Sequence, residues 1–239
     1  MVLAARRTDR LETLAAVIRA GGRKALVVAC DVTRDGDLEA AAARTRDTLG
    51  RIDVVVANAG FGVVGPVERL SVDDYRRQFE TNVFGVLRTL YATLPDLRQT
   101  RGRFAIIGSV SGHVSTPGGS AYAMSKFAVR ALAEALRPEV RRSGVAVTLI
   151  SPGFVESEIR LVDNQGALRT GTRDAVPAWL RMSAETAARK IVTAIERRRR
   201  EAVITGHGKL LVFLSCHFPG LMSVLVGLSG YRGRAESGS

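Results

Sequence analysis

The chain has only two cysteines and three histidines among its 239 residues. Cys30 and Cys216 lie far apart and match no metal-binding or redox spacing, which excludes a disulfide framework and a zinc module. We therefore expect a reduced, cytoplasmic chain without a metal site. The first ten residues carry three arginines and only a five-residue apolar run, so a signal peptide is not expected.

Acidic residues are also scarce, because 23 aspartates and glutamates stand against 35 lysines and arginines, giving a net charge of +12. Most of these cations are arginines spread through every segment, and no nucleic-acid-binding module accompanies them. The one dense run, Arg197 to Arg200, falls at the end of a predicted helix, where cations suit the helix dipole. We therefore expect no nucleic-acid partner.

No stretch has the composition of an interdomain linker, and 46% hydrophobic residues provide a sizeable core. Short apolar segments alternate with segments long enough for crossover helices, which is typical of a parallel sheet covered on both faces. We predict an α/β domain with a doubly wound parallel sheet over residues 1–205. Its expected strands are 2–5, 25–30, 54–57, 104–108, 145–150 and 202–205. Its expected helices are 8–20, 38–49, 71–94, 120–142 and 183–199.

Polar or glycine-containing residues follow each apolar strand at its carboxyl end. In an open α/β sheet these ends line the ligand crevice. We therefore expect Asp31, Asn58, Ser109 and the turn 151–153 to converge at one edge of the sheet.

Tyr122 and Lys126 together can carry out proton transfer. A helix places residues i and i+4 on one face, so the ammonium is expected beside the phenol. A phenol has a pKa of about 10, and a neighbouring cation lowers that pKa toward the working pH. Ser109, at a strand end, can hold a carbonyl or alcohol oxygen against the tyrosine. The pattern predicts Tyr122 as a general acid and base.

Four residues in chain order, Asn82, Ser109, Tyr122 and Lys126, resemble the catalytic set of the short-chain dehydrogenase/reductase family, and the similarity extends from about residue 2 to residue 205. The resemblance implies a Rossmann-like fold and hydride transfer between a nicotinamide cofactor and a carbonyl or alcohol carbon. It implies that the tyrosine exchanges the proton, the serine binds the substrate oxygen and the lysine binds the nicotinamide ribose. The asparagine would link the lysine to solvent through a water.

Three further motifs are similar to the family's cofactor-binding segments. Asp31-Val32 resembles the adenine-contacting pair, and Ala-Asn-Ala-Gly at 57–60 resembles an Asn-Asn-Ala-Gly motif with alanine in first place. Residues 152–157 resemble the segment that passes the nicotinamide, with serine where threonine is commoner. The cofactor-binding residues implied by the resemblance are Asp31, Val32, Asn58, Ala59, Gly60, Tyr122, Lys126, Pro152, Gly153, Val155 and Ser157.

The preferred cofactor is predicted from Arg6 and Arg7. The second strand of a Rossmann unit ends beside the adenosine ribose, where a carboxylate binds the 2′-hydroxyl of NAD. Residues 3–7 contain no carboxylate and two guanidiniums, which suit a 2′-phosphate. We expect NADP(H) to be preferred, with NAD(H) as the second candidate. The alternative is that one of these arginines is merely solvated at the helix start.

The family's opening strand and glycine-rich Thr-Gly-x-x-x-Gly-x-Gly turn have no counterpart in this sequence. We expect a sheet that is incomplete at its N-terminal side, because the absent strand is a central one and its absence exposes two strand edges. One interpretation is an internal start at Met1, or a fragment lacking about 30 residues. The competing function is a non-catalytic, dehydrogenase-like scaffold that does not bind cofactor.

A second region, residues 206–239, is predicted to be an apolar extension with a polar end. Residues 210–228 are mostly apolar, but Pro219-Gly220 interrupts them and their length is marginal for a membrane span. Three interpretations stay open. The extension covers the substrate pocket or a subunit interface, it makes peripheral membrane contact through 207–228, or it spans the membrane.

Residues 156–180 show no clear period and contain Gly166, Gly171 and Pro177, as expected of a lid over the substrate. Trp179 in this lid is predicted to pack against the protein and not to contact substrate. The extension is similar to those of some family members that act on lipophilic substrates, and this resemblance implies a bulky, lipophilic carbonyl or alcohol as the small-molecule substrate. The resemblance further implies a homo-oligomer built through the long helices, cytoplasmic and membrane-associated if the extension contacts lipid.

Overall fold

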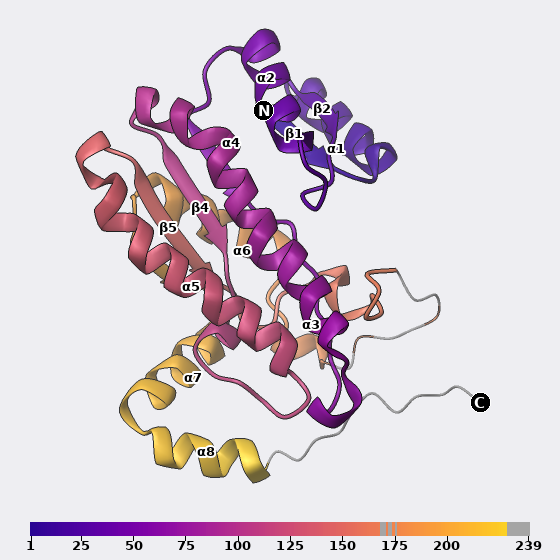
Figure 1. Ribbon diagram of the computed structural model, residues 1–239, viewed down its shortest axis with the longest axis vertical. Helices are drawn as coiled ribbons and strands as arrows, with labels where there is room; N and C mark the ends of the chain where they lie inside the picture. Colours follow the sequence, from indigo (N-terminus) through magenta and orange to yellow (C-terminus); the bar gives the residue numbers. More distant parts are fainter. Residues whose placement is uncertain (168–170, 172–173, 175, 229–239) are drawn as a thin grey trace.

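The computed structural model describes residues 1–167, 171, 174 and 176–228. All strand pairs in these residues are parallel, which confirms the expected α/β architecture (Figure 1). The strands form two sheets and not one continuous sheet. The first sheet is β1 (Val2–Ala5) with β2 (Leu26–Ala29), and the second has the order β3 (Val54–Ala57), β4 (Arg103–Ile107), β5 (Ala146–Ser151), β6 (Glu201–Val203).

The helices follow the predicted order. They are α1 (Thr8–Ala20), α2 (Asp37–Leu49), α3 (Val72–Phe79), α4 (Gly85–Thr100), α5 (Ser120–Val140), α6 (Ala184–Glu196), α7 (Gly206–His217) and α8 (Pro219–Leu228). Ser71 caps α3 as expected, since its Oγ accepts the amide of Asp74 while Asp74 Oδ2 accepts the amide of Ser71.

The predicted helix 71–94 differs from the structure in two ways. A π-helical segment, Glu80–Phe84, separates α3 from α4. The helix also continues past Pro95 to Thr100. Proline removes one hydrogen bond to the carbonyl four residues earlier, and that residue, Tyr91, is 66% exposed, so water can satisfy the freed oxygen.

The main core lies between the four-stranded sheet and the α4–α5 layer (Figure 1). Alternate residues of β4, Phe104 and Ile106, point into this core, because side chains along a strand alternate between the two faces. The next residue, Ile107, packs instead with the cluster that includes Ile150 and Ala194 of α6. The four-stranded sheet is therefore covered on both faces.

The two sheets are joined mainly through α4. Ala92 of α4 packs against the small cluster around Val28 of β2, and Arg46 of α2 forms an ion pair with Asp96 of α4 at 2.9 Å. Within the described residues, β1 and β3 each keep one edge without a strand partner. Two valines of β3, Val54 and Val56, are each 44% exposed, so the coverage of the four-stranded sheet on both faces does not extend to this strand.

The apolar extension folds as two short helices, α7 and α8, which project from the end of the molecule near the start of α5 (Figure 1). The chain changes direction at Phe218, immediately before Pro219. Across the described part of the chain, no helix combines the length and the hydropathy needed to cross a membrane.

Replacing Leu97, which is fully buried in α4, with alanine should lower the free energy of unfolding by about 3 kcal/mol, because the change leaves a cavity in the core. Leu14 on α1 is 49% exposed, and the same substitution there should cost about 1 kcal/mol or less. Urea denaturation followed by circular dichroism measures both values. Equal losses would contradict this location of the core.

Candidate active site

Tyr122 and Lys126 lie one turn apart near the start of α5, as the spacing predicts. Lys126 Nζ is 5.6 Å from the centroid of the Tyr122 ring. The lysine is buried, and its ammonium donates a hydrogen bond of 2.8 Å to the carbonyl oxygen of Ile107 at the end of β4. This bond fixes the first turns of α5 against the carboxyl edge of the sheet.

Ser109 follows β4 directly and lies at the same carboxyl edge of the sheet, beside the first turns of α5. Its hydroxyl acts to lower the pKa of the Tyr122 phenol, and it accepts the amide of Ser111 at 3.0 Å. The short 3₁₀ turn after it approaches α5 so closely that a Cβ on Gly112 would lie 2.8 Å from the carbonyl oxygen of Lys126. Glycine is therefore required at position 112 for the serine and the tyrosine to meet.

Asn82 connects three segments of the site from the π-helical segment between α3 and α4. Its amide nitrogen donates to the Phe61 carbonyl at 3.0 Å and to Ser125 Oγ at 3.1 Å, while its oxygen accepts the Phe61 amide at 3.1 Å. π-Helical insertions are frequent at functional sites. Gln78, which sequence reasoning missed, supports the same loop because it accepts the amide of Val63 at 2.6 Å and donates to the Phe61 carbonyl.

Burial sets the protonation of the pair. It lowers the pKa of Lys126 from 10.5 to about 8. Burial also raises the pKa of Tyr122, and the opposing effects of the Ser109 hydrogen bond and the charge of Arg160 are smaller. The expectation that the Tyr122 pKa is lowered was therefore wrong, since desolvation of the phenolate outweighs the effects of Ser109 and Arg160.

The segment predicted to pass the nicotinamide is held from three sides. The Pro152 carbonyl accepts the amide of Val110 at 2.9 Å, and Val155 forms a parallel bridge with Met182. Ser157 Oγ accepts the amide of Ile159 at 3.4 Å and caps a short turn. Gly153 has no space for a side chain, because a Cβ would collide with Thr205 and His207.

His207, another residue that the sequence did not single out, orients this segment. Its Nε2 accepts the amide of Phe154 at 3.0 Å, and the two rings stack at 5.3 Å between centroids. Burial lowers the pKa of His207, which keeps this nitrogen free to accept.

The adenine-side candidates lie on the two-stranded sheet, apart from the hydrogen bonds around Tyr122. Asp31 Oδ1 accepts the amide and hydroxyl of Thr33 at 3.0 and 2.8 Å. Burial acts to raise the pKa of Asp31. The hydrogen bonds from Thr33 and the charge of Arg6, 3.9 Å away, outweigh this effect and keep the pKa below its usual value. The turn that contains Val32 supplies no side-chain cap to α2, because Gly36 precedes that helix with φ of 85°.

Arg7 has a partner that the sequence did not predict. Both Arg7 and Arg10 donate to the carboxylate of Glu158, with nitrogen–oxygen distances of 3.2 Å from Arg7 and 2.7 and 2.8 Å from Arg10. These bonds lower the pKa of Glu158. Arg7 and Arg10 thus hold the Glu158 carboxylate between them, while Arg6 lies 3.9 Å from Asp31, so this end of the chain already binds anionic oxygens.

The loop after β3 lies between the two groups of candidates. Asn58, Ala59 and Gly60 are exposed. A Cβ on Gly60 would lie 3.1 Å from Asn82 Oδ1 and 3.8 Å from Lys126 Nζ, so the bare backbone here adjoins the buried lysine. The predicted convergence therefore holds for this loop, Ser109 and the 151–153 turn, whereas Asp31 stays on the other sheet.

A buried polar cluster beside Ser109 was also missed. His113 Nε2 lies 2.9 Å from Glu201 Oε1 and 3.2 Å from Ser151 Oγ. The hydrogen bond from His113 is the main reason that the Glu201 pKa lies below its usual value. The cluster joins the turn after Ser109 to β5 and β6.

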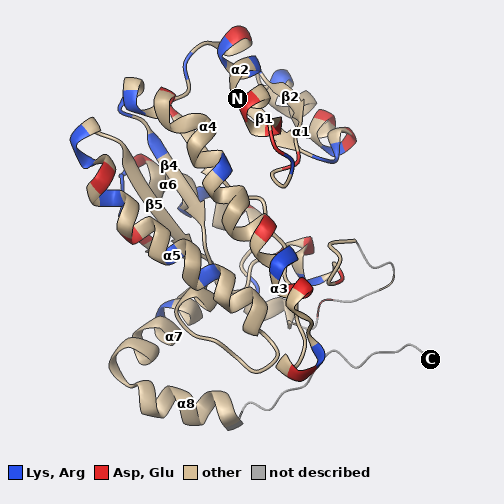
Figure 2. Cartoon of the chain, viewed as in Figure 1, with Lys and Arg blue, Asp and Glu red and all other residues tan. Residues whose placement is uncertain are grey.

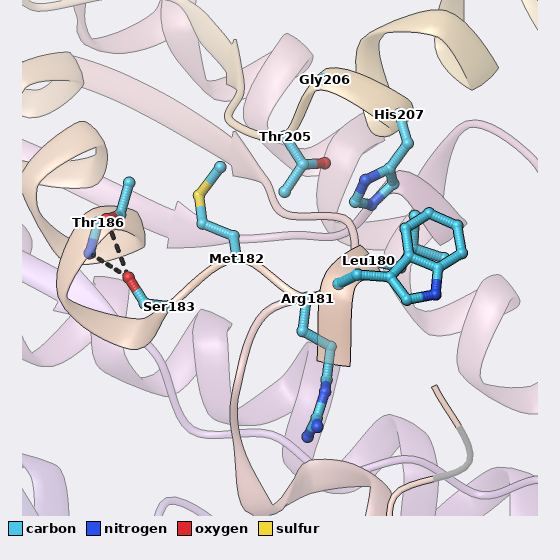
Figure 3. Close-up of a pocket in the computed structure, with 9 residues that line it drawn as sticks. Leu180, Arg181, Met182, Ser183, Thr186, Thr205, Gly206 and His207 are labelled. Carbon is cyan, nitrogen blue, oxygen red and sulfur yellow. Dashed lines mark hydrogen bonds between the residues drawn. The ribbon is translucent and has the colours of Figure 1, made fainter. Parts of the chain in front are cut away.

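A cavity of about 340 Å³ lies between the segment before α6 and the start of α7. Figure 3 shows Thr205 and His207 from the start of α7 facing the segment that contains Leu180 and Met182. None of Asn82, Ser109, Tyr122 and Lys126 lines it, so it is not the catalytic cavity.

The predicted lid can be judged only in part. Its residues 168–170, 172–173 and 175 lie outside the described residues. Trp179 is 84% exposed, so the expectation that it packs against the protein was wrong. Asp174 is held by Arg160 at 2.6 and 2.8 Å, and these hydrogen bonds lower its pKa to about 2.

The pKa of Lys126 predicts a pH effect on stability. Its folded pKa of about 8 lies below the unfolded value of 10.5, so the unfolded chain holds more protons between these values and stability rises with pH in this window. Urea unfolding at about pH 7.5 and at about pH 10 measures this effect. Between these two pH values, the free energy of unfolding of wild type should rise by up to about 3 kcal/mol relative to that of Lys126→Met. A pH-independent difference would show that the lysine is not desolvated.

Comparisons with known proteins agree with this geometry. A family model described as short chain dehydrogenase matches residues 1–167. Dehydrogenase/reductase SDR family member 7B from Bos taurus is 33% identical over 231 residues, which are 92% of this chain and 70% of that protein.

Solved structures show the same fold. An alcohol dehydrogenase from the archaeon Thermococcus sibiricus, complexed with 5-hydroxy-NADP, matches with a TM-score of 0.72 and 27% identity, covering 84% of this chain and 83% of that one. A short chain dehydrogenase/reductase from Burkholderia phymatum, in complex with NAD, matches with a TM-score of 0.80 at 23% identity, covering 92% and 85%. The chain therefore belongs to the short-chain dehydrogenase/reductase family of NAD(P)-dependent oxidoreductases.

Proposed function

We propose that this protein interconverts a carbonyl and an alcohol with NADP(H), and that Tyr122 is its general acid and base. The observation that carries this proposal is the meeting of the Tyr122 phenol, the Ser109 hydroxyl and the buried Lys126 ammonium at the carboxyl edge of the four-stranded sheet. Open α/β sheets bind their ligands at this edge.

The protonation of the pair suits the donation of a proton to a carbonyl oxygen. Because burial raises the pKa of Tyr122, the phenol holds its proton at neutral pH and can donate it to a carbonyl oxygen. Ser109 donates to or accepts from the same oxygen and stabilises the charge that develops there. Lys126, with a pKa of about 8, is cationic near neutrality. Its charge favours the phenolate that forms when Tyr122 gives up the proton.

Asn82 acts in this proposal as a positioning residue. Its side chain forms hydrogen bonds to Phe61 and Ser125 and thereby holds the loop before α3 against α5. Gly60 leaves bare backbone beside Lys126, a cradle that a Cβ would narrow. A nicotinamide group fits beside these residues, with Lys126, Asn58, Ala59 and Gly60 as its holders, and when bound it supplies the hydride.

Replacing Tyr122 with phenylalanine should reduce turnover by about 100-fold or more, because the proton donor is removed while the ring remains. NADPH affinity should stay within about threefold of wild type. Turnover is measured with NADPH and a panel of lipophilic aldehydes and ketones. Tyr91→Phe, at a 66% exposed site on α4, is the matched control. Near-normal turnover of Tyr122→Phe would overturn the proton-transfer role.

The preference for NADP(H) is supported by Arg6 and Arg7, which lie between β1 and α1. Arg7 binds Oε2 of Glu158, and Arg10 binds both oxygens of the same carboxylate. A guanidinium pair that holds a carboxylate is equally suited to a 2′-phosphate. Glu158 would then compete with the phosphate for Arg7.

Arg6→Ala combined with Arg7→Ala should weaken NADPH binding by about 10-fold to 100-fold and NADH binding by less than about threefold, because only NADPH carries the 2′-phosphate. Glu158→Gln should act in the opposite direction and tighten NADPH binding. Cofactor fluorescence titration measures the affinities. Arg141→Ala with Arg142→Ala, an exposed adjacent pair at the end of α5, is the control. Equal losses of both cofactors would refute the assignment.

The division of the strands into two sheets favours one competing function, a dehydrogenase-like scaffold without turnover. The same cofactor titration separates the two, since a scaffold binds neither NADPH nor NADH.

Exposed apolar side chains on the long helices, Phe84, Tyr91, Met124 and Phe127, support a homo-oligomer formed through α4 and α5. A cytoplasmic location with peripheral membrane contact through 207–228 and a lipophilic substrate complete the proposal.

A further inference from the structure

A cavity of about 310 Å³ at the β6 edge of the four-stranded sheet is lined by four cations. Arg189 and Lys190 belong to α6, Arg199 follows that helix, and Lys209 lies in the first turn of α7. Among the described residues, no aspartate or glutamate lines this cavity. We call it the cationic cavity. Four positive charges around one hollow create a potential that attracts an anion.

Contacts within the protein do not neutralise all four of these cations. Lys190 Nζ donates to the Ile204 carbonyl at 3.0 Å, and Arg189 Nη1 is 3.9 Å from Glu185 Oε1, an exposed and weak pair. The side chains of Arg199 and Lys209 form no ion pair with any residue that the structure describes, and both residues are exposed. The cavity therefore has at least two cations free to bind an external anion.

Lys209 also begins an exposed row of side chains along α7 and α8. This apolar stripe consists of Leu210, Phe213, Phe218, Leu221, Val224 and Leu225, each 44% to 59% exposed. Their spacing keeps them on the outer side of each helix. Lys209 is the only Asp, Glu, Lys or Arg in residues 206–228. Figure 2 shows α8 without a charged residue.

We propose that this face docks on an anionic membrane surface, with a lipid phosphate in the cationic cavity and the apolar stripe in the headgroup boundary. Helices of 12 and 10 residues are too short to span a bilayer but suit a position in its interface. Basic residues beside an apolar helix face add attraction to anionic lipids. The proposal extends the peripheral contact above and does not depend on the catalytic assignment.

A second copy of the chain fits this face less well. A two-fold contact brings the same patch of both protomers together, so the cations beside the stripe would face each other. Like charges opposed across an interface are unfavourable. An anionic lipid surface instead satisfies the cationic cavity and the apolar stripe at once.

The test is co-sedimentation with vesicles of phosphatidylcholine alone or with added phosphatidylglycerol. Wild type should bind the anionic vesicles more tightly. Arg199→Gln combined with Lys209→Gln should weaken this binding by about 25-fold, because each cation near an anionic leaflet contributes roughly fivefold. Arg23→Gln with Lys24→Gln removes the same charge from an exposed pair just before β2, on the other sheet, and should bind like wild type.

Other outcomes overturn the proposal. Equal losses in both double variants would mean attraction by net charge alone. Displacement by inorganic phosphate at matched concentration would mean a site for free phosphate and not for a lipid. Phe213→Ser with Leu221→Ser should weaken vesicle binding without changing the mass in sedimentation velocity. If that variant instead lowers the mass and keeps vesicle binding, the stripe is an interface between copies. Cofactor titration of each variant shows that the catalytic domain is unaffected.

Discussion

The buried side-chain amide of Asn82 is the contact on which the arrangement of the site depends. It forms hydrogen bonds to both backbone groups of Phe61 and to Ser125 Oγ. If the amide were lost, the Phe61 amide would be left without this bond, at a cost of about 1 to 3 kcal/mol, while the Phe61 carbonyl would keep its bond from Gln78. The Asn82 side chain joins the loop after β3, the π-helical segment and the start of α5.

Burial of Tyr122 and Lys126 shifts their pKa values and at the same time lowers the stability of the fold. Desolvation moves the pKa of Tyr122 up and the pKa of Lys126 down, so the two pKa values lie further apart than those of free tyrosine and lysine. Burying the Lys126 ammonium with one carbonyl partner costs folding free energy. Buried charges of this kind occur mainly at functional sites. The open sheet edge provides that location, since three strands end there and bring their following loops together.

The sequence predicted the elements and the catalytic group because both depend on local spacing. Strand alternation and the i, i+4 relation of Tyr122 and Lys126 can be read without a structure. The sequence could not predict the partners that distant segments supply, such as Gln78 for the loop after β3 or Glu158 for Arg7. The direction of the Tyr122 pKa also required the structure, because burial is a property of the folded chain. The prediction for Trp179 failed for a related reason. A large aromatic residue usually packs against the protein, but among the described residues Trp179 is 84% exposed.

The split of the strands into two sheets has a consequence for cooperativity. The unit formed by β1, α1 and β2 is joined to the rest through the α4 face and through exposed ion pairs at Glu158. Its own cluster is small, and exposed ion pairs add little free energy. Regions with few buried apolar contacts can open while the remainder stays folded. We therefore expect the N-terminal unit to behave as a foldon that opens at a lower free energy than the four-stranded sheet.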